Sequence, residues 1–226
     1  QNAAAGGASV PAGMVMRSDE ALERNVDLVT RWRDHPRVKA WLALRQILVC
    51  SPELISGISE AAHNLNTKIH THLCEGVYEI DYAAEEFGRR PAEYLADLGV
   101  LSPHLHCAHS ILLSPGDVDL YARHRPSACH CAFNNYQVGF PRLAEMWRRG
   151  IDIGLGTDGP VAWSSLDMFQ VAHQARIGQQ AVAGAPWAVR SAISSEEVLA
   201  VATRGGARAL GLADTAPAVL KEARDW

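Results

Sequence analysis

The sequence predicts an α/β protein built on a parallel β-sheet, and two observations lead to this expectation. First, apolar runs of strand length alternate with amphipathic helical stretches in about five successive units, as is typical of parallel strands joined by right-handed crossovers. Second, polar side chains capable of chemistry follow several of these runs, at the strand ends where parallel α/β folds build their sites. The sheet belongs either to an open doubly wound fold or to a (β/α)8 barrel.

The N-terminal part begins with a helix and then enters the alternating pattern. Apolar residues recur at helical spacing from Ser18 onward, with Ser18 or Asp19 as N-cap, and Pro36 ends this helix. The apolar run within residues 38–50 predicts a strand. Residues 51–65 predict a helix, because a serine caps it and a proline stands at its first position.

The alternation continues toward the C-terminal end. Strands are expected at residues 68–73, 105–108, 128–133 and 151–156. Helices are expected at residues 79–87 and 91–98, from Ser114 to Tyr121, at residues 142–149, and from the capping box at Ser194 to near Gly205. About five units in 226 residues fall short of a complete barrel, which usually has eight units and roughly 250 residues.

The composition is that of an ordinary globular protein and excludes several functional classes. The chain is 48% hydrophobic and 20% charged, with a net charge of -4, so it has no basic footprint for nucleic acid. We find no apolar run long enough to span a bilayer and no secretory signal. Five cysteines without framework spacing argue against a disulfide scaffold and predict a reducing, cytoplasmic setting. A homo-oligomer is compatible with these data.

A histidine pair followed by a glutamate is the first candidate site. His70 and His72 point to the same side of a strand, because strand side chains alternate. Glu75 follows three residues after His72, where the strand runs into its loop. A histidine can bind a metal while a nearby carboxylate moves protons from a metal-bound water. The alternative is a set of unrelated polar residues on an edge strand.

Other candidates stand at further strand ends. His106 ends its own strand and could equally be a core histidine bonded to the backbone, and His109 is expected to be structural or supporting. Asp158 lies in a Gly-Thr-Asp-Gly segment, which by itself resembles many turns. Cys129 and Cys131 flank a histidine but have no second cysteine pair at zinc-finger spacing, so a structural zinc site is not expected.

The order of four motifs carries more information than any one of them. HTHLCE, HCAH, CHCAFNN and LGTDG follow one another along the chain. This series resembles strands five to eight of the amidohydrolase superfamily, in the branch of the cytosine, guanine, pterin and S-adenosylhomocysteine deaminases and the triazine hydrolases. The resemblance covers residues 18–212 and implies a partial (β/α)8 TIM-type barrel of about strands four to eight. Residues 1–17 would then be a flexible lead-in and residues 213–226 a tail.

The resemblance also implies roles for individual residues. His72 corresponds to a metal-ligating histidine, and Glu75 to a proton-shuttling glutamate. His106 corresponds to a histidine that contacts the hydrolytic water or the substrate. Asp158 corresponds to a metal ligand that also orients the water, and Asn135 to an asparagine often found after strand seven. The implied cofactor is a divalent metal, zinc in preference to iron.

The implied activity is hydrolytic deamination of a heterocyclic amine of purine, pyrimidine, pterin or triazine type. Hydrolysis of an amide C–N or a C–Cl bond by the same water is the first alternative. Residues that flank the expected mouth are candidates for substrate binding, with packing or loop capping as the other interpretation of each: Arg45, Gln46, Asn134, Asn135 and Trp163.

One departure from the family is large. The family's first strand carries a His-x-His pair that supplies two metal ligands, whereas the glutamate at plus three assigns His70-Thr71-His72 to strand five. The first three strands are therefore expected to be absent from these residues. A catalytically incomplete chain, or a non-catalytic binding remnant, is the second alternative. Open sheet edges and self-association would follow from such a fragment.

Overall fold

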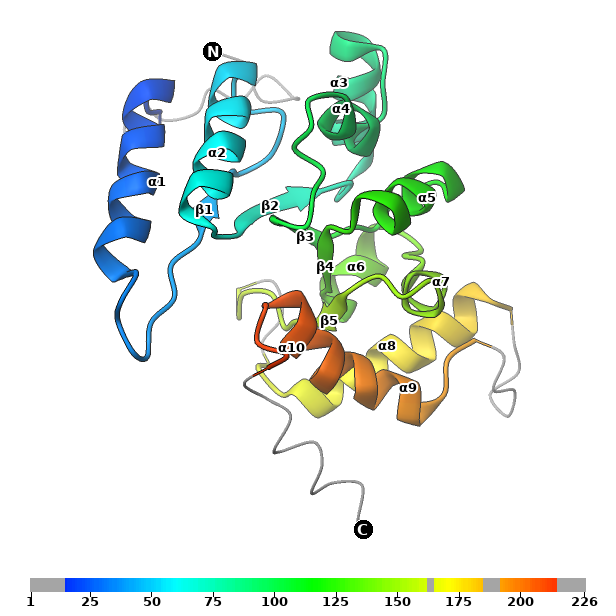
Figure 1. The fold of residues 1–226 in the computed structure, drawn as a ribbon. Coiled ribbons are helices and arrows are strands. Elements are labelled where there is room, and N and C mark those ends of the chain that lie inside the picture. Colours follow the sequence, from blue (N-terminus) through cyan, green and yellow to red (C-terminus); the bar gives the residue numbers. More distant parts are fainter. Residues whose placement is uncertain (1–14, 162–164, 185–191, 215–226) are drawn as a thin grey trace.

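The computed structural model describes residues 15–161, 165–184 and 192–214. Its centre is a sheet of five parallel strands in the order β1-β2-β3-β4-β5 (Figure 1). Each strand pairs with the next one along the chain. A doubly wound sheet reverses its strand order at a switch point, and this order has no reversal. The sheet is therefore an arc of a barrel, as the sequence led us to expect. The strands are β1 Leu42–Ala43, β2 Ile69–Leu73, β3 Leu105–His109, β4 Ser127–His130 and β5 Ile153–Leu155.

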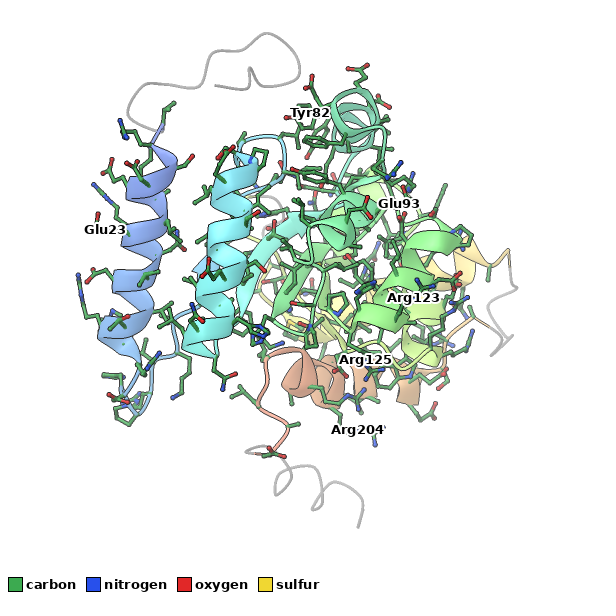
Figure 2. The ribbon with its side chains drawn as sticks, turned by 45° about the horizontal axis from the view of Figure 1, so that its top comes forward. Glu23, Tyr82, Glu93, Arg123, Arg125 and Arg204 are labelled. Carbon is green, nitrogen blue, oxygen red and sulfur yellow. The ribbon has the colours of Figure 1, made fainter. Side chains whose placement is uncertain are left out.

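Helices follow the strands and lie along the arc in chain order, from α1 and α2 at one end to α8, α9 and α10 at the other (Figure 1). Charged side chains such as Glu23, Arg123 and Arg204 project from their outer surfaces (Figure 2). The helices are α1 Ser18–Trp32, α2 Pro52–Leu65, α3 Val77–Phe87, α4 Pro91–Asp97, α5 Pro115–His124, α6 Ala132–Val138, α7 Leu143–Arg148, α8 Met168–Val182, α9 Ser195–Ala200, the π-helical turn η2 Val201–Gly205, and α10 Gly206–Ala209. None of the described helices is long and apolar enough to cross a membrane.

Serine caps begin three helices as predicted. The hydroxyl oxygens of Ser51, Ser114 and Ser194 accept hydrogen bonds from backbone N–H groups in the first turns of α2, α5 and α9, and each satisfies a donor that the helix itself leaves free. The N-cap predicted for the first helix was wrong. Arg17 occupies that position, and the hydroxyl of Ser18 instead lies 3.0 Å from the hydroxyl of Ser51, which ties α1 to α2.

The first strand is much shorter than the apolar run that predicted it. Only Leu42 and Ala43 pair with β2. After them the chain turns, and the Arg45 carbonyl accepts a hydrogen bond from the backbone N–H of His72. Ile47 and Leu48 are buried, so the run is apolar because it packs into the core as a turn.

The strand expected at residues 128–133 ends early, at His130, and α6 begins at Ala132. The Cys131 carbonyl accepts a hydrogen bond from the Asn135 N–H and so closes the first helical turn.

Helix α8 was not predicted at all. Its buried positions include Gln179 and Gln180, and these polar residues break the apolar periodicity that would have revealed it.

The last helical segment runs past its predicted end near Gly205. Helix α9 passes through the π turn η2 into α10, and both η2 and α10 pack against β5. The backbones meet closely there, because a Cβ added to Gly154 would lie 2.8 Å from the Gly206 Cα. Only glycine allows this approach.

Candidate functional site

Four histidines form a continuous row across β2 and β3. His70 pairs in register with His106 on the neighbouring strand, and their rings stack with centroids 5.8 Å apart. The ring centroids of His70 and His72 lie 5.5 Å apart. The rings of His72 and His109 stack at 5.2 Å. The row therefore reaches the carboxyl end of the sheet, where the loops after the strands begin.

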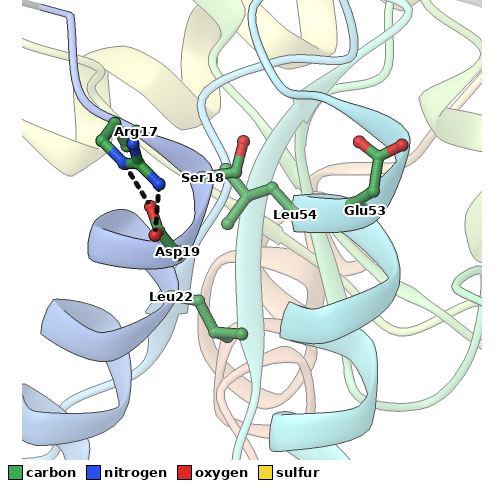
Figure 3. Close-up of a pocket in the computed structure, with 6 residues that line it drawn as sticks. All are labelled: Arg17, Ser18, Asp19, Leu22, Glu53 and Leu54. Atoms are coloured by element: carbon green, nitrogen blue, oxygen red, sulfur yellow. Dashed lines mark hydrogen bonds and ion pairs between the residues drawn. The ribbon is translucent and has the colours of Figure 1, made fainter.

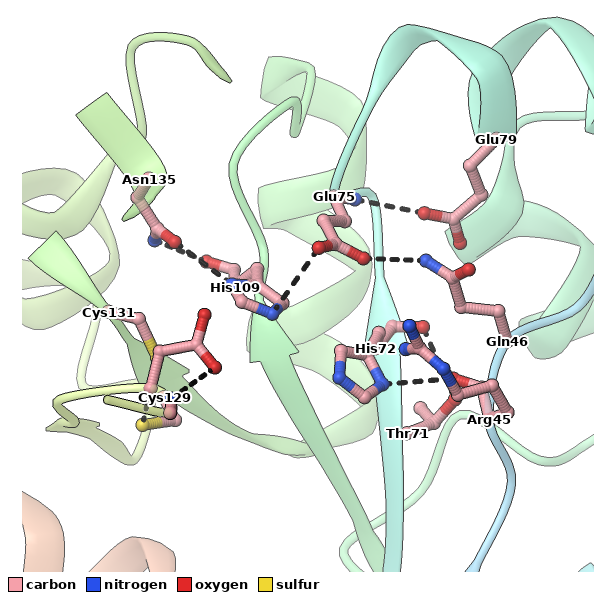
Figure 4. A network of polar contacts seen from close by, with 12 residues as sticks. Arg45, Gln46, Thr71, His72, Glu75, Glu79, His109, Cys129, Cys131 and Asn135 are labelled. Atoms are coloured by element: carbon pink, nitrogen blue, oxygen red, sulfur yellow. Dashed lines mark hydrogen bonds and ion pairs between the residues drawn. The ribbon is translucent and has the colours of Figure 1, made fainter. Parts of the chain in front are cut away.

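His72 is held in an orientation that suits a metal ligand. Its Nδ1 lies 3.0 Å from the carbonyl oxygen of Arg45 (Figure 4). A carbonyl only accepts, so Nδ1 carries the proton and Nε2 keeps its lone pair. Burial lowers the pKa of His72, which favours the neutral form that metals bind. Metal-ligating histidines commonly have one ring nitrogen fixed by a carbonyl in this way.

Glu75 is surrounded by donors from the loops after β1 and β2. Its Oε2 accepts hydrogen bonds from Gln46 Nε2 at 2.7 Å and from the Tyr78 hydroxyl at 3.2 Å. Its Oε1 faces His109 Nε2 at 3.6 Å (Figure 4). The two oxygens therefore have different roles, one anchored by the protein and one next to the histidine row.

A second glutamate, Glu79, holds the backbone of the first. Glu79 Oε2 accepts a 2.9 Å hydrogen bond from the Glu75 N–H, while its Oε1 is buried without a hydrogen-bond partner. Burial raises the pKa of the Glu79 carboxyl to about 7. Cys74, the residue directly before Glu75, has a positive φ of 52°, so the chain turns sharply between β2 and Glu75. Sequence reasoning missed Glu79, because a glutamate in a first helical turn is usually a surface residue.

The structure places His109, rather than His106, beside Glu75. His106 Nδ1 lies 2.9 Å from the Ser127 hydroxyl, and its ring packs edge-on against Trp41 with centroids 5.4 Å apart. His109 reaches Glu75 because the chain turns at the end of β3, where His109 has a φ of 69°. The second histidine of HCAH was the available signal for this position. The catalytic role of His106 stays a prediction.

Asp158 is engaged by its own loop. Its Oδ1 accepts a 2.8 Å hydrogen bond from the Gly159 N–H, and its φ is 58°. Its side chain is exposed. Its expected role as a metal ligand stays a prediction.

The residues proposed for substrate binding have different surroundings. Gln46 is 8% exposed, with its amide group on Glu75, and Asn135 is fully buried between His109 and His130. Asn134 is half-buried on α6. Trp163 lies outside the described residues. Gln46 and Asn135 thus hydrogen-bond to other site residues in this structure, and their contact with a substrate remains a prediction.

Among the described residues, His72 is oriented as a metal ligand, but a complete set of metal ligands is not found. Among them, no group of three or more histidine, cysteine, aspartate or glutamate side chains is arranged to hold a metal ion. All five cysteines are free thiols. A surface pocket at the start of α1 and α2 lies outside the histidine row, and its lining contains no histidine or cysteine (Figure 3). Its residues are Arg17, Ser18, Asp19, Leu22, Glu53 and Leu54.

Comparison with known proteins agrees with this arrangement. The sequence pattern of the amidohydrolase family matches residues 4–219. A 5-methylthioadenosine/S-adenosylhomocysteine deaminase from Teredinibacter turnerae is 32% identical over 198 residues, which are 87% of this chain and 44% of that protein. The corresponding deaminase 2 from Archaeoglobus fulgidus is 30% identical over 211 residues, which are 88% of this chain and 49% of that one.

Solved structures point to the same fold. An adenosine deaminase from Xanthomonas campestris with bound zinc superposes with a TM-score of 0.83 at 28% identity, over 91% of this chain and 46% of that one. The guanine deaminase of E. coli gives a TM-score of 0.77 at 23% identity, over 92% of this chain and 47% of that one, and this supports the fold alone. The chain spans about half the length of the curated relatives it matches. It belongs to the amidohydrolase family, and its five parallel strands are part of that family's (β/α)8 barrel.

Proposed function

We propose that this protein acts in the metal-dependent hydrolytic deamination of a heterocyclic amine. One observation carries the proposal: the Glu75 carboxylate lies beside the histidine row with one oxygen anchored by Gln46 and Tyr78 and the other turned toward His109. A carboxylate placed in this way suits the transfer of a proton between a water and a nearby base. The deaminase names of the relatives support the choice of reaction.

His72 is the residue of this chain best prepared to hold the metal. Its Nε2 is free because Nδ1 is taken by the Arg45 carbonyl, and an imidazole nitrogen is a preferred zinc ligand. We propose zinc before iron, since the similar adenosine deaminase carries zinc. When bound, such a metal makes a water more acidic, toward a pKa near 7. Asp158 is proposed as a second metal ligand. Its carboxylate would have to leave the Gly159 N–H and turn toward the metal.

Glu75 would move the protons. Gln46 and Tyr78 donate to Oε2, so Oε2 is occupied and Oε1 is the oxygen that can take a proton from the attacking water. The hydroxide would form a bond to the ring carbon that bears the amino group, while Glu75 passes this proton to the adjacent ring nitrogen. Transfer of the proton of the new hydroxyl group to the amino group would then break the C–N bond and release ammonia. His106 is proposed to stabilise the charge that develops on the substrate.

The substrate class we favour is an adenine-bearing nucleoside. The relatives named above act, by their names, on 5-methylthioadenosine and S-adenosylhomocysteine, and the solved neighbour acts on adenosine. Asn134 on α6 and Trp163 are proposed as substrate contacts at the mouth. Pyrimidine, pterin and triazine rings are the other amines to be tested.

The test is a substrate panel combined with metal analysis. The protein, loaded with zinc or iron, is incubated with adenosine, 5-methylthioadenosine, S-adenosylhomocysteine, guanine, cytosine, a pterin and a chlorotriazine, and both ammonia and chloride are measured. Ammonia release that is lost in Glu75→Gln supports the proposal. Chloride release alone would favour C–Cl hydrolysis. Absence of stoichiometric metal together with absence of both products would overturn the proposal in favour of a non-catalytic chain.

A further inference from the structure

Asn135 joins two histidines of the site, His109 and His130, through one buried side chain. It has no exposed surface and lies on α6, directly after β4. Its Oδ1 lies 3.1 Å from His109 Nδ1, and its Nδ2 lies 3.0 Å from the His109 carbonyl oxygen and 2.9 Å from His130 Nδ1. Both amide N–H groups and the amide oxygen therefore have partners within the protein, and Figure 4 shows Asn135 directed at His109.

The chemistry of these partners decides where the protons are. The His109 carbonyl can only accept, so it must face the NH2 group of Asn135 and not the oxygen. The second N–H of that group is directed at His130 Nδ1, which must then be an acceptor. The remaining atom, Oδ1, can only accept, and so His109 Nδ1 must carry a proton.

The consequence reaches Glu75. In the neutral form with its proton on Nδ1, His109 presents the lone pair of Nε2 to Glu75 Oε1 at 3.6 Å. This distance exceeds that of a hydrogen bond, as expected for two acceptors that face each other with no proton between them. The His109 ring is 3% exposed and stacks on His72, so it has little freedom to turn away.

We propose that Asn135 is a positioning residue that fixes His109 as its Nδ1–H tautomer and directs Nε2 at Glu75. When Glu75 carries a proton on Oε1, that O–H donates to His109 Nε2, and the hydrogen bond holds the acid in place between its two proton transfers. His109 is then the partner of Glu75 on the side opposite Gln46 and Tyr78. The tautomer follows from the hydrogen bonds alone, whereas the role in catalysis rests on the proposed function.

The tautomer is tested by nitrogen NMR of the histidine-labelled protein, with no metal or substrate added. His109→Gln identifies the His109 signals by their loss. The inference expects a protonated Nδ1 and an unprotonated Nε2 at neutral pH in the unaltered protein. An unprotonated Nδ1 would overturn it, and the protonation itself is read from the unaltered protein, with the variant used only to assign the signals.

Two variants test the positioning role. Asn135→Asp keeps an acceptor for His109 Nδ1 but loses both N–H donors. Asn135→Ala loses the acceptor and both donors. Gln137→Ala is the matched control, since Gln137 is on the same helix, is exposed and donates from its side chain to the Phe133 carbonyl. We expect the His109 signals to shift in Asn135→Ala, to shift less in Asn135→Asp, and to stay unchanged in the control. Unchanged signals in a folded Asn135→Ala protein would remove the positioning role.

Kinetics separate this inference from the proposed function. With an active substrate, Asn135→Ala should lower kcat roughly tenfold while KM stays within about twofold, because a positioning residue acts on the chemical step. A raised KM at constant kcat would instead make Asn135 a substrate contact and would overturn the proposal. If no substrate is turned over at all, the proposed function fails, while the NMR result still decides the tautomer.

Discussion

Gln46 donates a 2.7 Å hydrogen bond from Nε2 to Oε2 of Glu75, across two neighbouring strands. Gln46 stands in the turn after β1 and Glu75 in the loop after β2, so both come from carboxyl ends of parallel strands. The same Gln46 nitrogen lies 3.1 Å from the Tyr78 hydroxyl, which itself donates to Glu75. This closed triangle of polar atoms gives the carboxylate one orientation.

The first prediction follows from this triangle. Gln46→Ala should lower kcat by about 10- to 100-fold with little change in KM, since a hydrogen bond to a charged group contributes about 1.5–3 kcal/mol. Steady-state ammonia release measures both constants. Gln137→Ala, an exposed glutamine on α6, is the control and should match the unaltered protein. A higher KM at unchanged kcat would show that Gln46 contacts substrate, as the sequence suggested.

The second prediction concerns Glu79 and pH. Burial raises the pKa of its carboxyl in the folded state from the ordinary value of 4.5 to about 7. The folded protein therefore holds this proton more tightly than the unfolded chain does. The resulting stabilisation is fully present below pH 4.5 and is lost as the pH rises through about 7. Ionised Glu79 is a buried charge with one unpartnered oxygen, which is why the charged form is disfavoured.

Glu79→Gln isolates this effect, because the amide oxygen can still accept the Glu75 N–H but the side chain cannot ionise. Urea unfolding at several pH values should show the variant gaining stability relative to the unaltered protein as the pH rises from about 4.5 to 8, by on the order of 3 kcal/mol. Glu85→Gln, at an exposed position of α3, should change little. A constant difference between variant and unaltered protein at all pH values would disprove the shift.

Most element positions could be predicted from the sequence, because they depend on local pattern, whereas the choice of a barrel over a doubly wound sheet followed from the family resemblance. The alternation of apolar runs with capped helices located β2, β3, β5 and the caps at Ser51, Ser114 and Ser194, and the structure agrees. The exceptions have tertiary causes. Helix α8 buries Gln179, whose side chain bonds to the Pro141 carbonyl and the Tyr136 hydroxyl. The spacing of apolar residues in the sequence does not predict a helix that buries polar side chains through such contacts.

The site was predicted less completely than the fold. Glu75 and His72 were named as candidates from motif spacing, and the structure places both at the carboxyl end of β2, while their roles stay predictions. The pairing of His109 with Glu75 depends on a turn with positive φ at the end of β3, and a single sequence does not reveal such backbone geometry for a histidine. The role proposed for Asn135 depends on three partner atoms from two residues, His109 at the end of β3 and His130 at the end of β4.

The third prediction concerns the close contact between the last helices and β5. A Cβ on Gly205 would lie 2.2 Å from the Ile153 carbonyl oxygen, and neither backbone can easily move. Gly205→Ala should therefore lower the free energy of unfolding by about 3 kcal/mol, as measured by urea denaturation. Gly116→Ala on α5 is the matched control, since its Cβ would meet only the Ser114 hydroxyl at 3.7 Å. Equal stability of the two variants would show that η2 does not pack on β5 as described.

The fourth prediction concerns thiol reactivity. The hydrogen bond with Cys131, whose sulfur is 4.0 Å away, and the neighbouring His106 lower the pKa of Cys129. Cys129 is half-buried, whereas Cys107 is fully buried, and desolvation raises its pKa to about 12. Since the thiolate is the reacting form, Cys129 has both the charge and the access needed for alkylation.

At pH 6.5 and limiting iodoacetamide, peptide mass spectrometry should therefore find Cys129 modified well before Cys50, Cys74 and Cys107. His106→Gln should slow this reaction, because it removes one hydrogen bond to the sulfur. His124→Gln, at a histidine on α5, serves as the control and should leave the rate unchanged. Equal labelling of Cys129 and Cys107 under folded conditions would mean that the thiolate of Cys129 is not stabilised next to His106.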